Sequence, residues 1–170
     1  MAITTLNNRS INRSADLWRI NANFDLPNSN TVISSGWERC DEAIFDKIGT
    51  GMSESSGIFT FPSTGIWSVR FVAQAYSTDY AATNATAYIQ STANDSTYQE
   101  EARGWLGYES ADGNPPSRCH TSCETIVDIT DTSNRKVRFT GIDNDDVDFG
   151  LEGSTDANVT FAVFTRLGDT

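Results

Sequence analysis

The chain has 170 residues, a net charge of −11 at pH 7 and an aromatic content of 11%. This length fits one domain with a substantial core, with or without a short arm. The acidic balance argues against nucleic acid and anionic membranes as partners, because both attract clustered Lys and Arg. No stretch approaches the roughly 20 apolar residues of a membrane helix, and the N-terminus lacks the apolar segment of a signal peptide.

The N-terminal segment differs in charge from the rest of the chain. Residues 1–20 hold three arginines against one aspartate, so they carry +2 and the remainder carries −13. Residues 1–17 show no sustained hydrophobic period and predict an extended arm, followed by one domain over 18–170. Arginines interleaved with apolar residues can dock on an acidic protein surface. The residues expected to dock are Leu6, Arg9, Ile11, Arg13, Leu17, Trp18 and Arg19.

Strands are predicted throughout the domain. Alternating apolar positions predict a first strand over 18–26. The segment 37–48 fits either a helical face or a short strand, and its context favours the strand. A short strand over 58–61, a Pro-Ser-Thr-Gly turn and a long strand over 66–76 follow. Further strands are expected at 85–90, 102–108, 119–129, 136–142, 147–152 and 159–167.

Two of these strands, 66–76 and 159–167, are apolar on both faces. In an antiparallel protein, such a strand contacts the core on one face and another covering surface, such as a second subunit, on the other. The residues assigned to that subunit interface are Ile66, Val72, Tyr76 and Phe164. Eight to ten short strands without a convincing helix predict an all-β sandwich or jelly roll.

The central strands resemble those of the C1q/TNF-like jelly-roll family. Its signature of Phe, five residues, Gly and alternating apolar positions stands here as Phe59, Gly65, Trp67, Val69 and Phe71, with Trp where Tyr is usual and Val where Phe is usual. The closing segment 159–167 is similar to the family's last strand, which lies beside the first in the inner sheet. The resemblance implies a compact homotrimer in which inner-sheet strands pack both inward and across a threefold axis.

The opening MAITTLNNRSINRSAD resembles the start of structural proteins of marine tailed bacteriophages. That resemblance implies a virion structural protein, made in the host cytoplasm and placed on the virion surface. Its expected partners are its own copies and a capsid or other virion protein. The leading hypothesis is a trimeric decoration or cement protein attached to the capsid by its arm. The alternative is a tail-fibre or adhesin tip that binds a host-surface glycan through Tyr80, Tyr98 and Trp105.

Catalytic chemistry is not expected. His120 is the single histidine and follows Cys119, and neighbours on a strand point to opposite faces, so they cannot form a dyad. No Gly-x-Ser-x-Gly elbow occurs. We therefore assign no catalytic residue, no enzymatic activity and no cofactor. Asp143, Asp145 and Asp148 form a weak calcium candidate, because hard oxygen ligands suit calcium but the EF-hand pattern fails.

The three cysteines, Cys40, Cys119 and Cys123, are expected to be free thiols. Their odd number leaves no complete disulfide framework. Cys119 and Cys123 would lie on one face of a strand about 13 Å apart, which is too far for a bridge.

Overall fold

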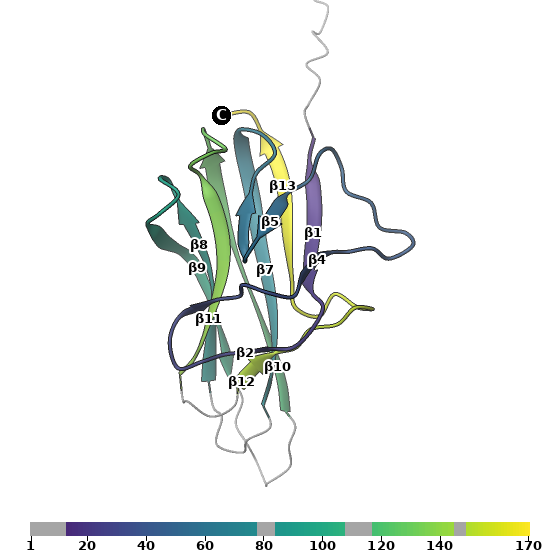
Figure 1. Ribbon diagram of the computed structural model, residues 1–170, viewed down its shortest axis with the longest axis vertical. Helices are drawn as coiled ribbons and strands as arrows, with labels where there is room; N and C mark the ends of the chain where they lie inside the picture. The colour runs from purple at the N-terminus through teal and green to yellow at the C-terminus, as the bar shows by residue number, and fades with distance from the viewer. Residues whose placement is uncertain (1–12, 78–83, 108–116, 145–148) are drawn as a thin grey trace, which may run out of the picture.

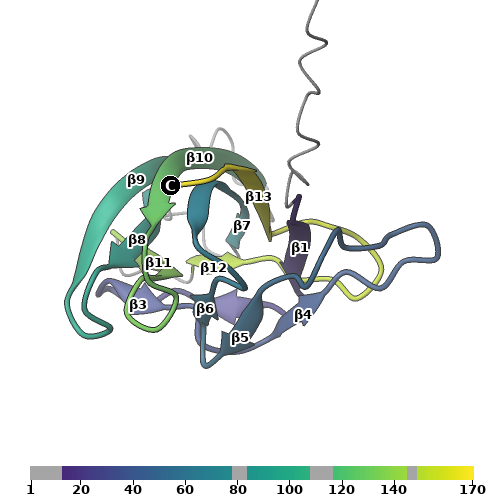
Figure 2. The same cartoon turned by 90° about the horizontal axis from the view of Figure 1, so that it is seen from above.

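The computed structural model describes residues 13–77, 84–107, 117–144 and 149–170. These residues form thirteen β-strands and no helix, so the described ranges contain no helix that could cross a membrane. The strands build two antiparallel sheets, which face each other as a sandwich (Figures 1 and 2). The predicted all-β jelly roll is confirmed.

The seven-stranded sheet is organised around its longest central strand, β7. On one side β7 pairs with β10 along its whole length; on the other it pairs with β13 and then β12. β1 and β4 extend the sheet beyond β13, and β2 pairs with β12. The strands are β1 (Ala15–Ile20), β2 (Phe24–Asp25), β4 (Trp37–Arg39), β7 (Gly65–Ser77), β10 (Ser117–Ile129), β12 (Phe149–Leu151) and β13 (Phe161–Gly168).

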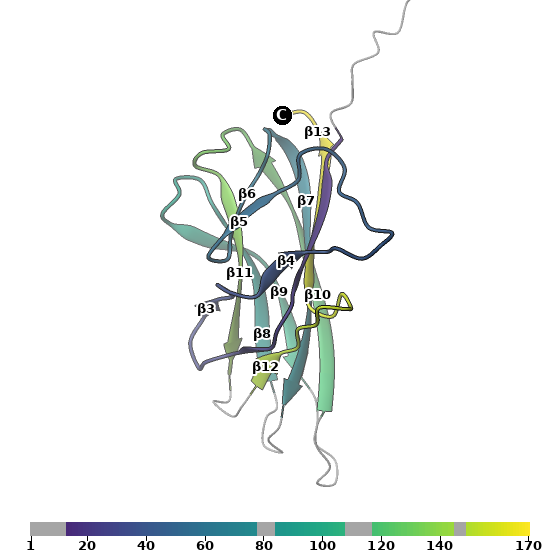
Figure 3. The ribbon, with the colours of Figure 1, turned by 45° about the vertical axis from the view of Figure 1, so that its right-hand side comes forward.

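The six-stranded sheet runs in the order β5-β6-β11-β8-β9, with β3 also paired to β11. Its strands are β3 (Thr31–Val32), β5 (Ser53–Ser55), β6 (Ile58–Thr60), β8 (Asn84–Thr92), β9 (Tyr98–Gly107) and β11 (Lys136–Asp143). Figure 3 shows this sheet on one side of the sandwich and β7, β13 and β1 on the other. β9 and β10, the outer strands of the two sheets, lie close together, because Gly104 leaves room for the Thr121 side chain.

Two sequence predictions about the strands are wrong. The single strand expected over 18–26 is divided into β1 and β2, since the chain bends at 21–23, where the Asn21 N–H donates to the Gly36 carbonyl at 2.8 Å. The described residues also contain thirteen strands rather than eight to ten, because two- and three-residue strands such as β3 and β5 are too short to show a period.

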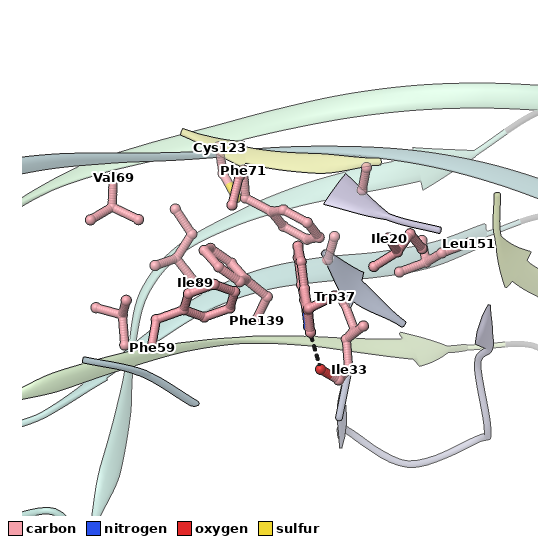
Figure 4. Close-up of a cluster of buried hydrophobic side chains, with 14 of the residues drawn as sticks. Ile20, Ile33, Trp37, Phe59, Val69, Phe71, Ile89, Cys123, Phe139 and Leu151 are labelled. Carbon is pink, nitrogen blue, oxygen red and sulfur yellow. Dashed lines mark hydrogen bonds between the residues drawn. The ribbon is translucent and has the colours of Figure 1, made fainter. Parts of the chain in front are cut away.

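Aromatic rings from both sheets fill the core (Figure 4). Phe71 and Phe139 lie 4.6 Å apart between ring centroids, and Trp37 meets Phe59 edge-to-face at 5.1 Å. The buried Trp37 indole satisfies its polar group by donating to the Ile33 carbonyl at 2.6 Å. Offset and edge-to-face ring contacts of this kind add stability beyond the apolar area that they bury.

The residues of the Phe-to-Gly motif and the strand after it lie in the core. Phe59, Trp67, Val69 and Phe71 are all fully buried. Gly65 begins β7 with a φ of +142°, and a Cβ there would lie 2.6 Å from the Gly168 carbonyl oxygen. A side chain at Gly65 would therefore be strained and would push away the end of β13.

Candidate assembly surface

The side of the seven-stranded sheet that points away from the six-stranded sheet is the best candidate for a functional surface, and we call it the outer face. Alternate residues of β7 from Trp67 to Ala75 are fully buried between the sheets, so the residues between them point to the outer face. Strand register then places the outward residues of β1, β13 and β10 beside them.

An apolar cluster lies at the centre of the outer face. Leu17 is the register partner of Val163, and Phe161 is the partner of Val72, so these four side chains from three adjacent strands form neighbouring rows. All four are only half-buried in the single chain. Ile126 on β10 is 64% exposed. An apolar cluster that stays partly accessible on a β-sheet is typical of a protein–protein contact.

Three of the four predicted interface residues lie on the outer face, and the fourth does not. Ile66, Val72 and Tyr76 point to the outer face and are half-buried. Tyr76 is also engaged within the chain, because its hydroxyl lies 3.1 Å from the Asp25 carboxylate. The assignment of Phe164 to the interface is wrong, because its side chain is fully buried and packs on Phe59 with a 5.1 Å separation between ring centroids. Phe161 and Val163 take the outward positions of β13.

The proposed boundary between arm and domain is also wrong. β1 begins at Ala15, and the Asp16 side chain is fully buried. Asp16 accepts hydrogen bonds from the Arg39 guanidinium, the Trp18 indole at 3.0 Å and the Met52 N–H at 2.7 Å. The Arg39 guanidinium in turn lies 4.6 Å from the centroid of the Trp18 ring. Leu17 and Trp18 therefore belong to the folded domain and not to a docking arm.

Arg19 is the strongest departure from the docking-arm prediction. Its side chain is fully buried and forms ion pairs with Glu38 at 2.8 Å, Asp41 at 2.7 Å and Glu42 at 3.0 Å. It also donates to the Thr155 carbonyl. Burial acts to lower the pKa of Arg19, but hydrogen bonds to Glu38 and Glu42 outweigh it and raise the pKa above its ordinary value. Arg19 therefore joins two loops to β1 and is not available to a partner.

Among the described residues that were expected to dock, Arg13 is the exposed one. Leu6, Arg9 and Ile11 lie outside the described residues. A largely apolar hollow of about 350 Å³ lies beside Arg13, where Ile48 and Leu167 are each 53% exposed. Arg13, the first described residue, therefore lies beside an accessible apolar surface.

The outer face is polar near the end of β7 and the start of β10, and its side chains there are hydrogen-bonded to one another. Glu152 accepts hydrogen bonds from Arg118 at 2.7 Å and from Gln74 at 2.6 Å. The hydrogen bond from Arg118 outweighs the effect of burial and lowers the pKa of Glu152. Because these groups already satisfy one another, this region has less to gain from a partner than the apolar centre.

The aromatic residues of the glycan hypothesis differ in accessibility. Trp105 on β9 is 62% exposed. Tyr98 is half-buried beneath Arg138, whose guanidinium lies 3.9 Å from the ring centroid. Burial and the nearby Asp95 charge raise the pKa of Tyr98. Tyr80 lies outside the described residues, so Trp105 alone is described with an open aromatic surface.

Among the described residues, the groups considered for catalysis and metal binding do not come together. His120 is exposed, whereas Cys119 packs against the core from the opposite face of β10. Asp143 is buried, and its carboxylate accepts the Phe149 N–H at 3.4 Å; Asp145 and Asp148 lie outside the described residues. Within the described ranges, no three His, Cys, Asp or Glu side chains gather closely enough to hold a metal ion.

The cysteines are free thiols, as predicted, and Cys40 and Cys123 are buried. Burial raises the pKa of Cys119, and it raises the pKa of Cys123 to about 11. Both thiols are therefore protonated at neutral pH and poor nucleophiles.

The strand order and the two facing sheets define a TNF/C1q-like jelly roll. Among solved structures, the chain is similar to Eiger TNF from S. frugiperda, with a TM-score of 0.62 and 12% identity over 93% of this chain and 94% of that chain. It is also similar to murine APRIL, with a TM-score of 0.54 and 14% identity over 91% of this chain and 99% of that chain. No protein-family model and no curated protein matches the sequence.

Proposed function

We propose that this protein is a structural, non-enzymatic protein whose jelly-roll head assembles as a homotrimer through the outer face. The observation that carries the proposal is the half-buried apolar cluster of Leu17, Val72, Phe161 and Val163 on the side of the sheet opposite the core. Burying such a cluster against another subunit is favourable by roughly 25 cal/mol per Å² of apolar surface. The TNF-like fold supports the same arrangement.

We further propose that the trimer decorates or cements a bacteriophage capsid, held there by its N-terminal arm. The support is the basic, partly apolar arm on an acidic domain and the apolar hollow beside Arg13. Three arms on one trimer would bind together, so a weak single contact would become firm attachment.

The first test is the mass of the full chain in solution. Light scattering is expected to give about 56 kDa, three times the 18.6 kDa chain. Assembly should persist at high salt, because an apolar interface is not weakened by screening. A monomer at micromolar concentration would rule out the trimeric head.

The second test concerns attachment. Deleting residues 1–12 spares β1 and Asp16, so the head should fold and assemble normally. Gold-labelled antibody against the protein should mark the capsid of particles that carry the full chain. It should not mark particles that are assembled in the presence of the truncated chain only. Capsid labelling of both would refute the role of the arm, and labelling confined to the tail would refute decoration.

A second candidate function is a glycan-binding adhesin or fibre tip. Trp105 favours it, because this 62% exposed ring lies on the six-stranded sheet and not on the outer face. It would therefore stay accessible if the outer face were covered, and sugars stack on open aromatic rings. Specific binding on a glycan array, lost in Trp105→Ala, is the expected result for an adhesin. Unchanged binding in that variant would exclude this site.

A further inference from the structure

The outer face consists of two chemically different halves. On β1 and β13 the half-buried Leu17, Val163 and Phe161 form an apolar surface that continues to Val72 on β7. On β10, the edge strand, Ile126 projects with 64% of its surface exposed, and Glu124 is exposed two residues away on the same side. One half can receive a protruding apolar group, and the other half provides one.

Arg70 lies where the two halves meet. It is exposed at the centre of β7, between its register partners Val163 on β13 and Glu124 on β10. Glu124 accepts a hydrogen bond from the Ser68 hydroxyl at 2.6 Å. Among the described residues, no hydrogen bond or ion pair satisfies the Arg70 guanidinium, although a carboxylate lies on the next strand.

Covering this face would remove Arg70 and Glu124 from water. A buried charge without a partner is strongly unfavourable, so a covering surface that offers a carboxylate to Arg70 and a cation to Glu124 is favoured over an apolar one. A second copy of the chain can do so, because each copy carries both a cation and an anion on this face. Contact between two different patches of identical chains is heterologous, and such contacts form a closed ring when the rotation between successive copies closes.

The spacing of the two patches is compatible with this contact. Ile126 and Glu124 are two residues apart on one strand, about 7 Å, and Val163 and Arg70 lie on adjacent strands about 5 Å apart. We propose that Ile126 and Glu124 of one copy pack against Val163 and Arg70 of the next. This inference rests on the proposed self-assembly and identifies the residues that determine its register.

Charge reversal in the full chain tests the pairing. R70E and E124R are each expected to weaken assembly at least tenfold, measured by sedimentation at low salt. E124R reduces the net negative charge and so reduces the general repulsion between copies, yet it should still weaken assembly because it removes the specific pairing. R103E is the control, because Arg103 lies on the six-stranded sheet as a half-exposed partner of Glu100 and R103E changes the net charge as R70E does. R103E should assemble like the unaltered chain.

Mixing the two variants distinguishes contacts between chains from contacts within a chain. In a mixed trimer, the new carboxylate of an R70E chain faces the new guanidinium of an E124R chain at one contact, and the unaltered Glu124 and Arg70 meet at a second. Mixing should therefore restore two of the three contacts. Restored assembly supports the proposal. If the single variants assemble normally, or the mixture stays dissociated, the proposed pairing is wrong. A monomeric unaltered chain would instead refute self-assembly itself.

The apolar half of the contact has its own test. Ile126→Ser should weaken assembly at least tenfold without changing the circular dichroism spectrum of the fold. Ile44→Ser, at a fully exposed isoleucine in the loop after β4 and not on a strand of the outer face, is the matched control and should leave the mass unchanged. Equal effects of the two substitutions would overturn the role of Ile126.

Discussion

Replacing Arg19 by methionine is expected to lower the free energy of unfolding by about 3–5 kcal/mol. Methionine keeps an unbranched side chain but leaves Glu38, whose side chain is only 26% exposed, without its cation. Arg103→Met is the control, because Arg103 and Glu100 are 49% and 37% exposed, and such pairs contribute about 1 kcal/mol or less. Urea unfolding of both variants at equal protein concentration measures the difference. Equal losses would mean that Arg19 is not a structural residue.

The same variant has a defined pH dependence. Burial acts to raise the pKa of Glu38, but hydrogen bonds from Arg19 and Asn21 outweigh it and hold the pKa below its ordinary value of 4.5. A carboxyl group with a lowered pKa in the folded state stabilises the fold above its unfolded pKa. That contribution is lost as the pH falls through the folded value. The stability difference between the unaltered chain and Arg19→Met should therefore be largest near pH 7 and shrink below 4.5. A difference independent of pH would contradict the ion pair.

Phe59→Ala is the second large effect, with an expected loss of about 3–5 kcal/mol. Phe59 is fully buried on β6 and contacts rings from the opposite sheet, with centroid separations of 5.6 Å to Trp18, 5.1 Å to Trp37 and 5.1 Å to Phe164. Removing the ring leaves a cavity between the two sheets, which their long paired strands cannot readily close.

Two controls make the Phe59 result specific. Phe59→Leu keeps most of the volume and should cost less than about 1.5 kcal/mol. Trp105→Ala removes a larger but exposed ring and should change stability by about 0.5 kcal/mol or less. Guanidinium unfolding at fixed protein concentration gives the comparison, since self-assembly would make the apparent stability concentration-dependent. A Phe59→Ala loss no greater than that of Phe59→Leu would show that the ring contacts are not central to the core.

Long strands could be located from the sequence, and short ones could not. The strand predicted over 66–76 is β7 at 65–77, and the strand predicted over 136–142 is β11 at 136–143. A long strand that buries one face must alternate, so its pattern is visible in a single sequence. The two residues of β3 carry no such pattern, and they pair only because β11 lies beside them.

The candidate surface shows where that reasoning stops. The alternation of β13 reveals two apolar faces but does not say which one is inside, so Phe164 was assigned to the interface although it is in the core. Only the register with β7 decides this, because it places Phe164 beside the buried Val69 and Phe161 beside the outward-pointing Val72. Arg70 and Glu124 become neighbours only through the pairing of β7 with β10.

The sequence by itself determined the all-β class, the jelly-roll motif around Phe59 and Gly65, and the acidic character of the domain. These follow from local periodicity and composition, which need no knowledge of distant contacts. Only the tertiary structure decided that Arg19 is buried, because its partners Glu38 and Thr155 come from distant parts of the chain. Arg19, which the sequence predicts to be a docking group, is instead bound by carboxylates that lie near it only in the folded chain.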